Sequence, residues 1–300
     1  MCCPQQPDEL TNPNNLLMKN KITLFIALLA SASLFAAVSP KEKEALVQLY
    51  QATNGSQWTQ SWDLNAPVNS WFGVVLKNDK VVSLDLSNNH LVGELPASIT
   101  DLSNLQKLNL FRNEISGVIP ASISNLKDLK YFNLGFNKLS GTIPSQLGDL
   151  SNLQSVELFM NELTGTIPAQ IGNLKQLKIL SLFNNELSGT IPTAVYDLTS
   201  LRVLLLNSNK LTGKLSKEVA NMSSLENLSL FENNMDGQVP FDLERLPKLK
   251  EMNISYNNFS GAVSRNLAQL DTLNMTMVNE SGLAVVLPVE DRTSALAEED

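Results

Sequence analysis

A 24-residue unit recurs eight times without insertion or deletion, and this repeat constrains the fold more than any other feature of the chain. The units run from Val81 to Thr272 and cover 192 of the 300 residues. Counted from the start of each unit, positions four and six are apolar, position nine is asparagine and position thirteen is glycine. Self-similarity at a period of roughly 20–50 residues indicates stacked coils that form a solenoid.

Each constant position has a physical reason. Positions four and six point to one face of a short strand, which only neighbouring coils can bury. The asparagine amide offers two donors and an acceptor, so we expect an asparagine ladder inside the solenoid. Glycine permits a tight backbone path, and a proline at position sixteen of six units stops the return segment from continuing as a helix. The asparagines are Asn89, Asn113, Asn137, Asn161, Asn185, Asn209, Asn233 and Asn257.

The pattern LxxLxLxxNxLxGxIPxxLxxLxx resembles the plant-type subfamily of leucine-rich repeat proteins. The resemblance covers residues 81–272 and implies an α/β solenoid. It further implies a right-handed, curved array with a parallel sheet on the concave face and short helical or 3₁₀ segments on the convex face. A helical N-terminal cap would cover the first coil.

Residues 38–80 fit such a cap. The stretch Ser39-Pro40-Lys41-Glu42 combines an N-cap serine, a proline at the first helical position and a glutamate at N3, which predicts a capping box and a helix. Plant members flank the tryptophan motif of this cap with paired cysteines. This segment has none, which favours a secreted bacterial or algal relative. Four aromatic side chains are expected to form an apolar plug: Trp58, Trp62, Trp71 and Phe72.

The sequence predicts a cleaved signal peptide near the N-terminal end and a cap at the C-terminal end. From Met18 a basic stretch, an apolar run and small residues through Ala37 read as a secretory signal peptide over 18–37. A membrane anchor is the alternative, although the apolar run is short for one. Residues 1–17 precede the signal, which indicates a misassigned start or a non-native leader. Residues 273–300 are expected to form a degenerate C-terminal cap and an acidic tail.

Composition excludes several classes of function. The net charge is −8, so the basic face of a nucleic-acid-binding protein is not expected. The only histidine is His90, at a variable exposed position, and the only cysteines are Cys2 and Cys3. No phosphate loop, dinucleotide fingerprint or nucleophile elbow occurs. We therefore expect no enzyme activity, no cofactor and no metal site.

The concave face, at positions three, five, seven and eight, is the candidate binding surface. Large rings recur at positions seven and eight, with charges between them, and exposed aromatic surface often marks a binding face. The alternative is that the rings stack from coil to coil and only stiffen the sheet. The candidate partner-binding residues are Phe111, Arg112, Phe136, Glu157, Phe159, Phe183, Phe231 and Tyr256.

These features favour a non-enzymatic module, secreted or at the cell surface, that binds a protein or a polysaccharide. We expect a monomer with no membrane span in the mature chain. A receptor-like or glycosidase-inhibitor role, similar to that of polygalacturonase inhibitors, is the alternative implied by the family. A third possibility is binding of ice or ordered water by hydroxyls at positions twelve and fourteen: Ser140, Thr142, Thr164, Thr166, Ser188 and Thr190.

Overall fold

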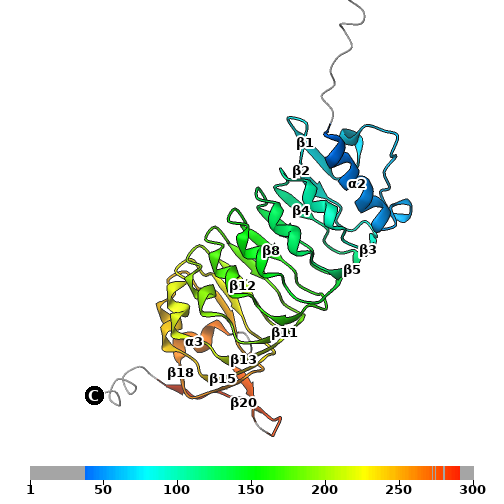
Figure 1. Ribbon diagram of the computed structural model, residues 1–300. Coiled ribbons are helices and arrows are strands. Elements are labelled where there is room, and N and C mark those ends of the chain that lie inside the picture. Colours follow the sequence, from blue (N-terminus) through cyan, green and yellow to red (C-terminus); the bar gives the residue numbers. More distant parts are fainter. Residues whose placement is uncertain (1–37, 272, 274, 280, 291–300) are drawn as a thin grey trace, which may run out of the picture. The chain divides into compact units, whose positions relative to one another are not determined.

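The computed structural model describes residues 38–271, 273, 275–279 and 281–290. The expectations for residues 1–37, a leader and a signal peptide, and for the acidic end at 291–300 lie outside the described residues. From Val38 onward the chain forms one compact unit of stacked coils (Figure 1). Among the described residues, none of the helices has the length and apolarity that a bilayer crossing demands.

One strand from each of the eight repeats and β1 from the N-terminal cap form a nine-stranded sheet, in the order β1-β2-β4-β6-β8-β10-β12-β14-β16. From β2 onward neighbours are parallel and pair in constant register, so that Leu84 lies opposite Leu108 and Leu108 opposite Phe132. The pairing therefore places equivalent repeat positions side by side. The strands are β1 (Val74–Lys77), β2 (Lys80–Asp85), β4 (Lys107–Asn109), β6 (Tyr131–Asn133), β8 (Ser155–Glu157), β10 (Ile179–Ser181), β12 (Val203–Leu205), β14 (Asn227–Ser229) and β16 (Glu251–Asn253).

A second row of short strands follows the position-nine asparagine along the side of the solenoid. It comprises a three-stranded and a five-stranded parallel sheet, which an isolated bridge between Thr142 and Thr164 connects. These lateral strands are β3 (Val92–Glu94), β5 (Glu114–Val118), β7 (Lys138–Ser140), β9 (Thr164–Thr166), β11 (Glu186–Gly189), β13 (Lys210–Lys214), β15 (Asn234–Gln238) and β17 (Asn258–Ser260).

Seven 3₁₀ turns form the opposite, convex side. A proline occupies the N-cap of six of them, as Pro168 does for η6, and Ser216 takes its place at η8. Because proline fixes φ and lacks an N–H, the return segment begins extended and stays short. The turns are η3 (Ala97–Asp101), η4 (Ala121–Asn125), η5 (Ser145–Asp149), η6 (Ala169–Asn173), η7 (Thr193–Asp197), η8 (Lys217–Asn221) and η9 (Phe241–Arg245).

The core is a continuous column of apolar side chains between the sheet and the 3₁₀ turns. In a typical coil, Leu108 and Leu110 point inward from the strand and Ile123 and Leu126 from the convex side, all fully buried. Burial of this apolar area is the main stabilising term for the stack. The predicted parallel sheet and 3₁₀ convex face are therefore confirmed.

The asparagine ladder is also confirmed, and its hydrogen bonds link consecutive coils. In the fourth repeat, Asn161 Oδ1 accepts from the Leu139 N–H of the preceding coil at 3.0 Å. Its Nδ2 donates to the carbonyls of Leu134 and Leu158, both at 3.0 Å. At the first repeat the cap replaces a preceding coil, because Asn89 Oδ1 accepts from Gln60 N at 2.6 Å.

The N-terminal cap begins with helix α2 (Pro40–Ala52). The Ser39 hydroxyl accepts from the Glu42 N–H at 3.3 Å, which is half of the predicted capping box. The other half differs: the buried Glu42 carboxylate accepts from the Val81 N–H at 3.2 Å and so joins the helix to the first strand of the repeats. Two 3₁₀ turns follow, η1 (Gly55–Gln57) and η2 (Val68–Ser70).

The predicted aromatic plug forms without one of its members. Trp58, Trp62 and Trp71 are buried and pack together, with Trp62 and Trp71 stacked at 4.8 Å between ring centroids. Phe72 is wrongly included, since 45% of its surface is exposed. It precedes a β-hairpin of β1 and β2, whose turn residues Asn78 and Asp79 have positive φ, and this hairpin reverses the chain into the first repeat.

The C-terminal end replaces the 3₁₀ turn with helix α3 (Arg265–Leu270), preceded by β18 (Val263–Ser264). A hairpin of β19 (Thr276–Val278) and β20 (Ala284–Val286) follows, and β21 (Val289–Glu290) pairs with β18. The proposed cover over Leu283–Val289 is only partial: Leu287 is buried, whereas Leu283 and Val286 are exposed. The last coil is covered instead by the buried side chains of Met275 and Met277, and the Tyr256 N–H donates to the Thr276 carbonyl at 2.7 Å.

Candidate functional site

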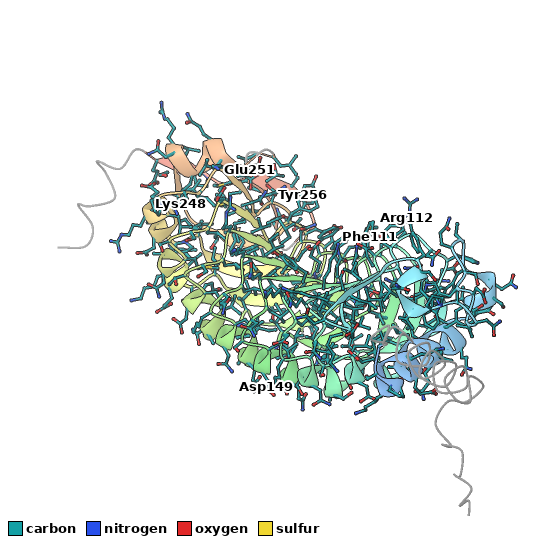
Figure 2. The ribbon with its side chains drawn as sticks, turned by 90° about the horizontal axis from the view of Figure 1, so that it is seen from above. Phe111, Arg112, Asp149, Lys248, Glu251 and Tyr256 are labelled. Atoms are coloured by element: carbon teal, nitrogen blue, oxygen red, sulfur yellow. The ribbon has the colours of Figure 1, made fainter. Side chains whose placement is uncertain are left out.

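Three residues after each concave strand of the repeats, the chain adopts a left-handed backbone conformation. Position eight has φ between 52° and 57° in every repeat, although none of the eight residues is glycine. They are Asn88, Arg112, Phe136, Met160, Asn184, Ser208, Glu232 and Tyr256. Figure 2 shows Phe111, Arg112, Glu251 and Tyr256 along one side of the solenoid and Asp149 on the opposite side. The left-handed turn thus follows the strand and sets a second side chain beside that of position seven.

The predicted aromatic residues form two groups rather than one stripe. In the first group, Phe159 stacks on Phe183 with centroids 4.7 Å apart and planes inclined by 8°. Phe111 contacts Phe159 at 5.9 Å, two coils away, and Phe136 at 6.4 Å. Phe159 reaches across because the intervening position seven is Gly135, where a Cβ would come within 2.7 Å of its ring.

The second group pairs Phe231 with Tyr256, whose centroids are 5.2 Å apart. Asn207 occupies position seven of the repeat between the two groups. All these rings keep exposed surface, which reaches 43% for Phe136 and 45% for Tyr256. The stacking considered as the alternative therefore occurs, and the rings also keep surface that a ligand could contact.

Apolar side chains that the sequence analysis overlooked fill the centre of the concave sheet. Ile179 and Val203 lie side by side at position three, and Leu205 occupies position five opposite Ser181. All three are partly exposed, and Tyr131 is 47% exposed two strands away from Ile179. Comparing positions three and five across the repeats, rather than along each strand, would have revealed this patch.

Charged groups lie toward the N-terminal coils of the same face. Lys107 Nζ donates to the Asp85 carboxylate at 2.8 Å and Asn109 Nδ2 donates to it at 3.0 Å. Partial burial raises the pKa of Asp85, but hydrogen bonds from Lys107, Asn109 and Ser87 outweigh it and lower the pKa to about 2. The carboxylate therefore remains charged at neutral pH.

Toward the C-terminal coils, two bases bracket Glu226. Arg202 Nε donates to it at 2.6 Å and Lys250 Nζ at 2.8 Å, and these hydrogen bonds lower the pKa of Glu226 to about 2. In the central coils the predicted Glu157 is engaged within the sheet, because its carboxylate accepts from Asn133 Nδ2 at 3.1 Å and Ser155 Oγ at 2.7 Å.

A hollow of about 380 Å³ lies at the N-terminal end of the concave side and brings the predicted Arg112 and Phe136 together with His90. The guanidinium lies 5.9 Å from the centroid of the Phe136 ring. His90 Nδ1 lies 3.0 Å from the Glu114 carboxylate, and a hydrogen bond from Lys138 lowers the pKa of Glu114. The imidazole is 56% exposed, as expected for a surface residue.

The hydroxyl ladder divides into two rows with different roles. At position twelve, Ser140 Oγ donates to the Gly117 carbonyl at 3.3 Å and Thr164 Oγ1 to the Gly141 carbonyl at 3.2 Å. These hydroxyls are therefore engaged within the solenoid, unlike the threonines at position fourteen. Within residues 38–290 as described, no group of three or more metal-ligating side chains gathers.

Comparison with known proteins agrees with this geometry. Residues 79–139 match the family described as leucine rich repeat, and residues 158–281 match the leucine-rich repeat region family. The HAESA receptor kinase ectodomain of Arabidopsis, in complex with an IDA peptide hormone, aligns with 28% identity and a TM-score of 0.68. That alignment covers 84% of this chain and 42% of the ectodomain.

Two further solved structures are similar. The ectodomain of the Arabidopsis thaliana receptor kinase GASSHO1/SCHENGEN3, in complex with CASPARIAN STRIP INTEGRITY FACTOR 2, has 37% identity and a TM-score of 0.58 over 59% of this chain and 21% of that one. A plant ice-binding protein has 26% identity and a TM-score of 0.60 over 85% of this chain and 99% of its own.

This chain therefore spans less than half the length of these two receptor ectodomains. Family matches, repeat register and the asparagine ladder agree on one architecture. The described part of this chain is a leucine-rich repeat solenoid.

Proposed function

We propose that this chain is a non-enzymatic recognition module that binds a polypeptide along its concave face. The observation that carries the proposal is the arrangement of that face: an apolar centre between two charged ends. Ile179 belongs to the same repeat as Phe183 of the stacked pair, and Val203 and Leu205 belong to the next repeat, so the apolar residues gather in the central coils. An apolar core with a polar rim is the usual anatomy of a protein–protein interface.

The charges at the two ends favour a polypeptide over a polysaccharide on this face. Asp85 and Lys107 lie at one end of the face. Glu226 and Lys250, at position two just before their strands, border it toward the other end, so both signs are present at each. Mixed charge complements a chain that itself carries both signs. The peptide complexes of the HAESA and GASSHO1 ectodomains support a similar use of this fold here.

The receptor-like and inhibitor alternatives remain compatible with this surface, since each would also bind a protein. A secreted or cell-surface location, a monomeric state and a bacterial or algal origin belong to the same proposal. The signal-like stretch at 18–37 and the similarity to receptor ectodomains support the location.

Ice binding is not our proposal, although one similar structure is an ice-binding protein. An ice plane requires a flat array of available hydroxyls. Here Ser140 and Thr164 of position twelve are engaged by backbone carbonyls, and the row of threonines at position fourteen lines a groove.

The experiment compares capture of a binding partner by three full-length proteins: the wild type, Phe159→Ser with Phe183→Ser, and a convex control, Lys127→Ser with Gln176→Ser. The wild type and the control should retain the same protein, and the concave variant should lose about 2 kcal/mol or more of binding free energy. Equal binding by all three folded proteins would place the interface elsewhere.

A further inference from the structure

A groove of about 940 Å³ runs along the side of the solenoid, across the second to fifth repeats. It lies between the lateral strands and the 3₁₀ turns, away from the aromatic groups of the concave face. Its least exposed lining residues are isoleucines at position fifteen, such as Ile143 and Ile167. Its exposed polar residues are the position-fourteen threonines Thr142, Thr166 and Thr190, with Ser145, Gln146 and Gln170 across the groove.

The fold fixes the orientation of the three threonines. The Cγ2 methyl of Thr142 lies 2.9 Å from the point where a Cβ on Gly165 would stand, so it occupies the space that the glycine leaves. Thr166 and Thr190 make the same contact with Gly189 and Gly213, at 2.9 and 2.8 Å. Because the methyl is held by the next coil, the hydroxyl of each threonine has a defined direction.

These hydroxyls differ from those of position twelve. Among the residues that the structure describes, the Oγ1 atoms of Thr142, Thr166 and Thr190 have no hydrogen-bond partner, whereas Ser140 and Thr164 donate to glycine carbonyls. Adjacent parallel strands lie about 4.8 Å apart, so the row presents one unpaired, oriented hydroxyl at each such step. A ligand that bonds to it need not immobilise the side chains first.

The groove has no charged side chain along its described lining, and charged side chains occupy the repeats on either side of it. None of its described lining residues is ionisable. The equivalent position of the preceding repeat is Glu94, and the following repeat has Lys214 and Lys217. An anionic or cationic chain would gain nothing from such a lining, so its occupant should be neutral and rich in hydroxyl groups.

From this chemistry we propose that the groove binds a neutral, extended polysaccharide, with about one sugar ring per coil. An extended glycan advances by a similar length per ring, which keeps its hydroxyls in step with the threonines and glutamines. The carbon faces of the sugars pack on the prolines and alanines, such as Pro168 and Ala169. This site is independent of the proposed polypeptide site on the concave face.

The test titrates the full chain with three neutral probes, β-1,4-glucohexaose, β-1,3-glucohexaose and β-1,4-mannohexaose, and with oligogalacturonate of equal length as an anionic comparison. We expect saturable binding of a neutral hexasaccharide and weaker binding of oligogalacturonate. The variant Thr142→Val, Thr166→Val, Thr190→Val keeps every methyl against its glycine and removes only the hydroxyls. It should lose about tenfold or more in affinity, since each hydrogen bond is worth roughly 0.5–1.5 kcal/mol.

Thr212→Val, an exposed threonine on β13 that does not line the groove, is the matched control and should bind like the wild type. Phe159→Ser with Phe183→Ser should also retain glycan binding, which separates this proposal from the concave interface. Three results would overturn it: no saturable binding of any neutral probe, equal affinity of the triple valine variant, or equal affinity for oligogalacturonate. If the wild type binds no glycan but shows thermal hysteresis that the triple valine variant loses, the threonine row would be assigned to ice binding instead.

Discussion

The Asp271 carboxylate accepts a hydrogen bond from the backbone N–H of Ile254 at 2.8 Å. In the preceding coil the equivalent N–H, that of Leu230, donates to the Asn253 carbonyl of the next strand. Asp271 thus provides the acceptor that a further repeat would supply, and it also accepts from Ser255 Oγ at 3.1 Å and Leu273 N at 2.9 Å. This side chain therefore completes the hydrogen bonding of the last strand, where the Asp271 backbone also forms an isolated parallel bridge with Met252.

Replacing this carboxylate should loosen the last repeat. Asp271→Ala leaves buried donors unpaired, and we expect a loss of about 1–3 kcal/mol in the free energy of unfolding. Hydrogen exchange should accelerate at Ile254 and remain unchanged at Leu110, because the loss is local. Asp149→Ala on the convex side is the control and should change neither quantity. Uniform acceleration along the solenoid would contradict a local role.

Removing one member of the asparagine ladder should cost more in the middle than at the cap. Asn161→Ala abolishes three hydrogen bonds of 3.0 Å, so we expect a loss of about 1–3 kcal/mol. The Asn89 side chain makes one short bond to Gln60 N and a longer one, 3.4 Å, to the Gln60 carbonyl, so Asn89→Ala should cost less. Urea unfolding of both variants measures the difference, and negligible losses at both sites would show that the ladder is not structural.

Acid should remove the contribution of Asp85 within a narrow pH window. Its pKa is about 2 in the folded chain, against about 3.9 in an unfolded one, so its stabilising effect is present above pH 4 and is lost as the pH falls toward 2. Asp85→Asn cannot titrate. The stability difference between wild type and Asp85→Asn should therefore shrink between about pH 4 and pH 2. A difference that stays constant over that range would show that the carboxylate has no depressed pKa.

The repeat glycines should resist substitution for two separable reasons. Gly165 has φ +77°, and a Cβ there would approach Thr142 Cγ2 to 2.9 Å. Gly165→Ala should destabilise the chain by about 1 kcal/mol or more through backbone strain and this contact together. Adding Thr142→Ser removes the methyl, so the double variant should recover part of the loss and keep the part due to φ. Full recovery would mean that the backbone conformation carries no strain.

The melting temperature should not depend on reductant. The described coils contain no cysteine, and their stability comes from stacked apolar side chains such as Leu108 and Leu180. Calorimetry of the full chain with and without excess reductant should give the same melting temperature. A large decrease upon reduction would show that Cys2 and Cys3 form a stabilising bond.

Strict periodicity made most of the fold predictable. Asparagine at position nine, as in Asn113, and glycine at position thirteen, as in Gly117, recur every 24 residues because each coil packs on its neighbours. A sequence pattern that predicts one coil therefore predicts the strands, the asparagine ladder and the 3₁₀ turns of all of them. Where the repeat stops, this constraint stops as well. The exposure of Phe72 and the antiparallel hairpin at Thr276–Val286 follow from contacts that occur only once.

The candidate site was predictable only in part. The sequence left open whether the rings at Phe159 and Phe183 stack or only offer a binding face, and they stack. The split into two aromatic groups and the apolar patch around Val203 depend on which side chains become neighbours across strands. The orientation of Thr142 depends on a glycine 23 residues later, and no pattern within a single strand indicates that contact.

The left-handed residue that follows the concave strand in each repeat limits how this surface can diversify. A positive φ is unfavourable for residues branched at Cβ, and valine, isoleucine and threonine are absent from position eight in all eight repeats. Position seven carries no such backbone restriction. Selection or a combinatorial library can therefore change specificity at the exposed position-seven residues without this restriction, Gly135 under the Phe159 ring excepted. At position eight it must draw on unbranched, aromatic or small polar side chains. By restricting the residue types at position eight, the left-handed backbone limits which new ligands the protein can evolve to recognise.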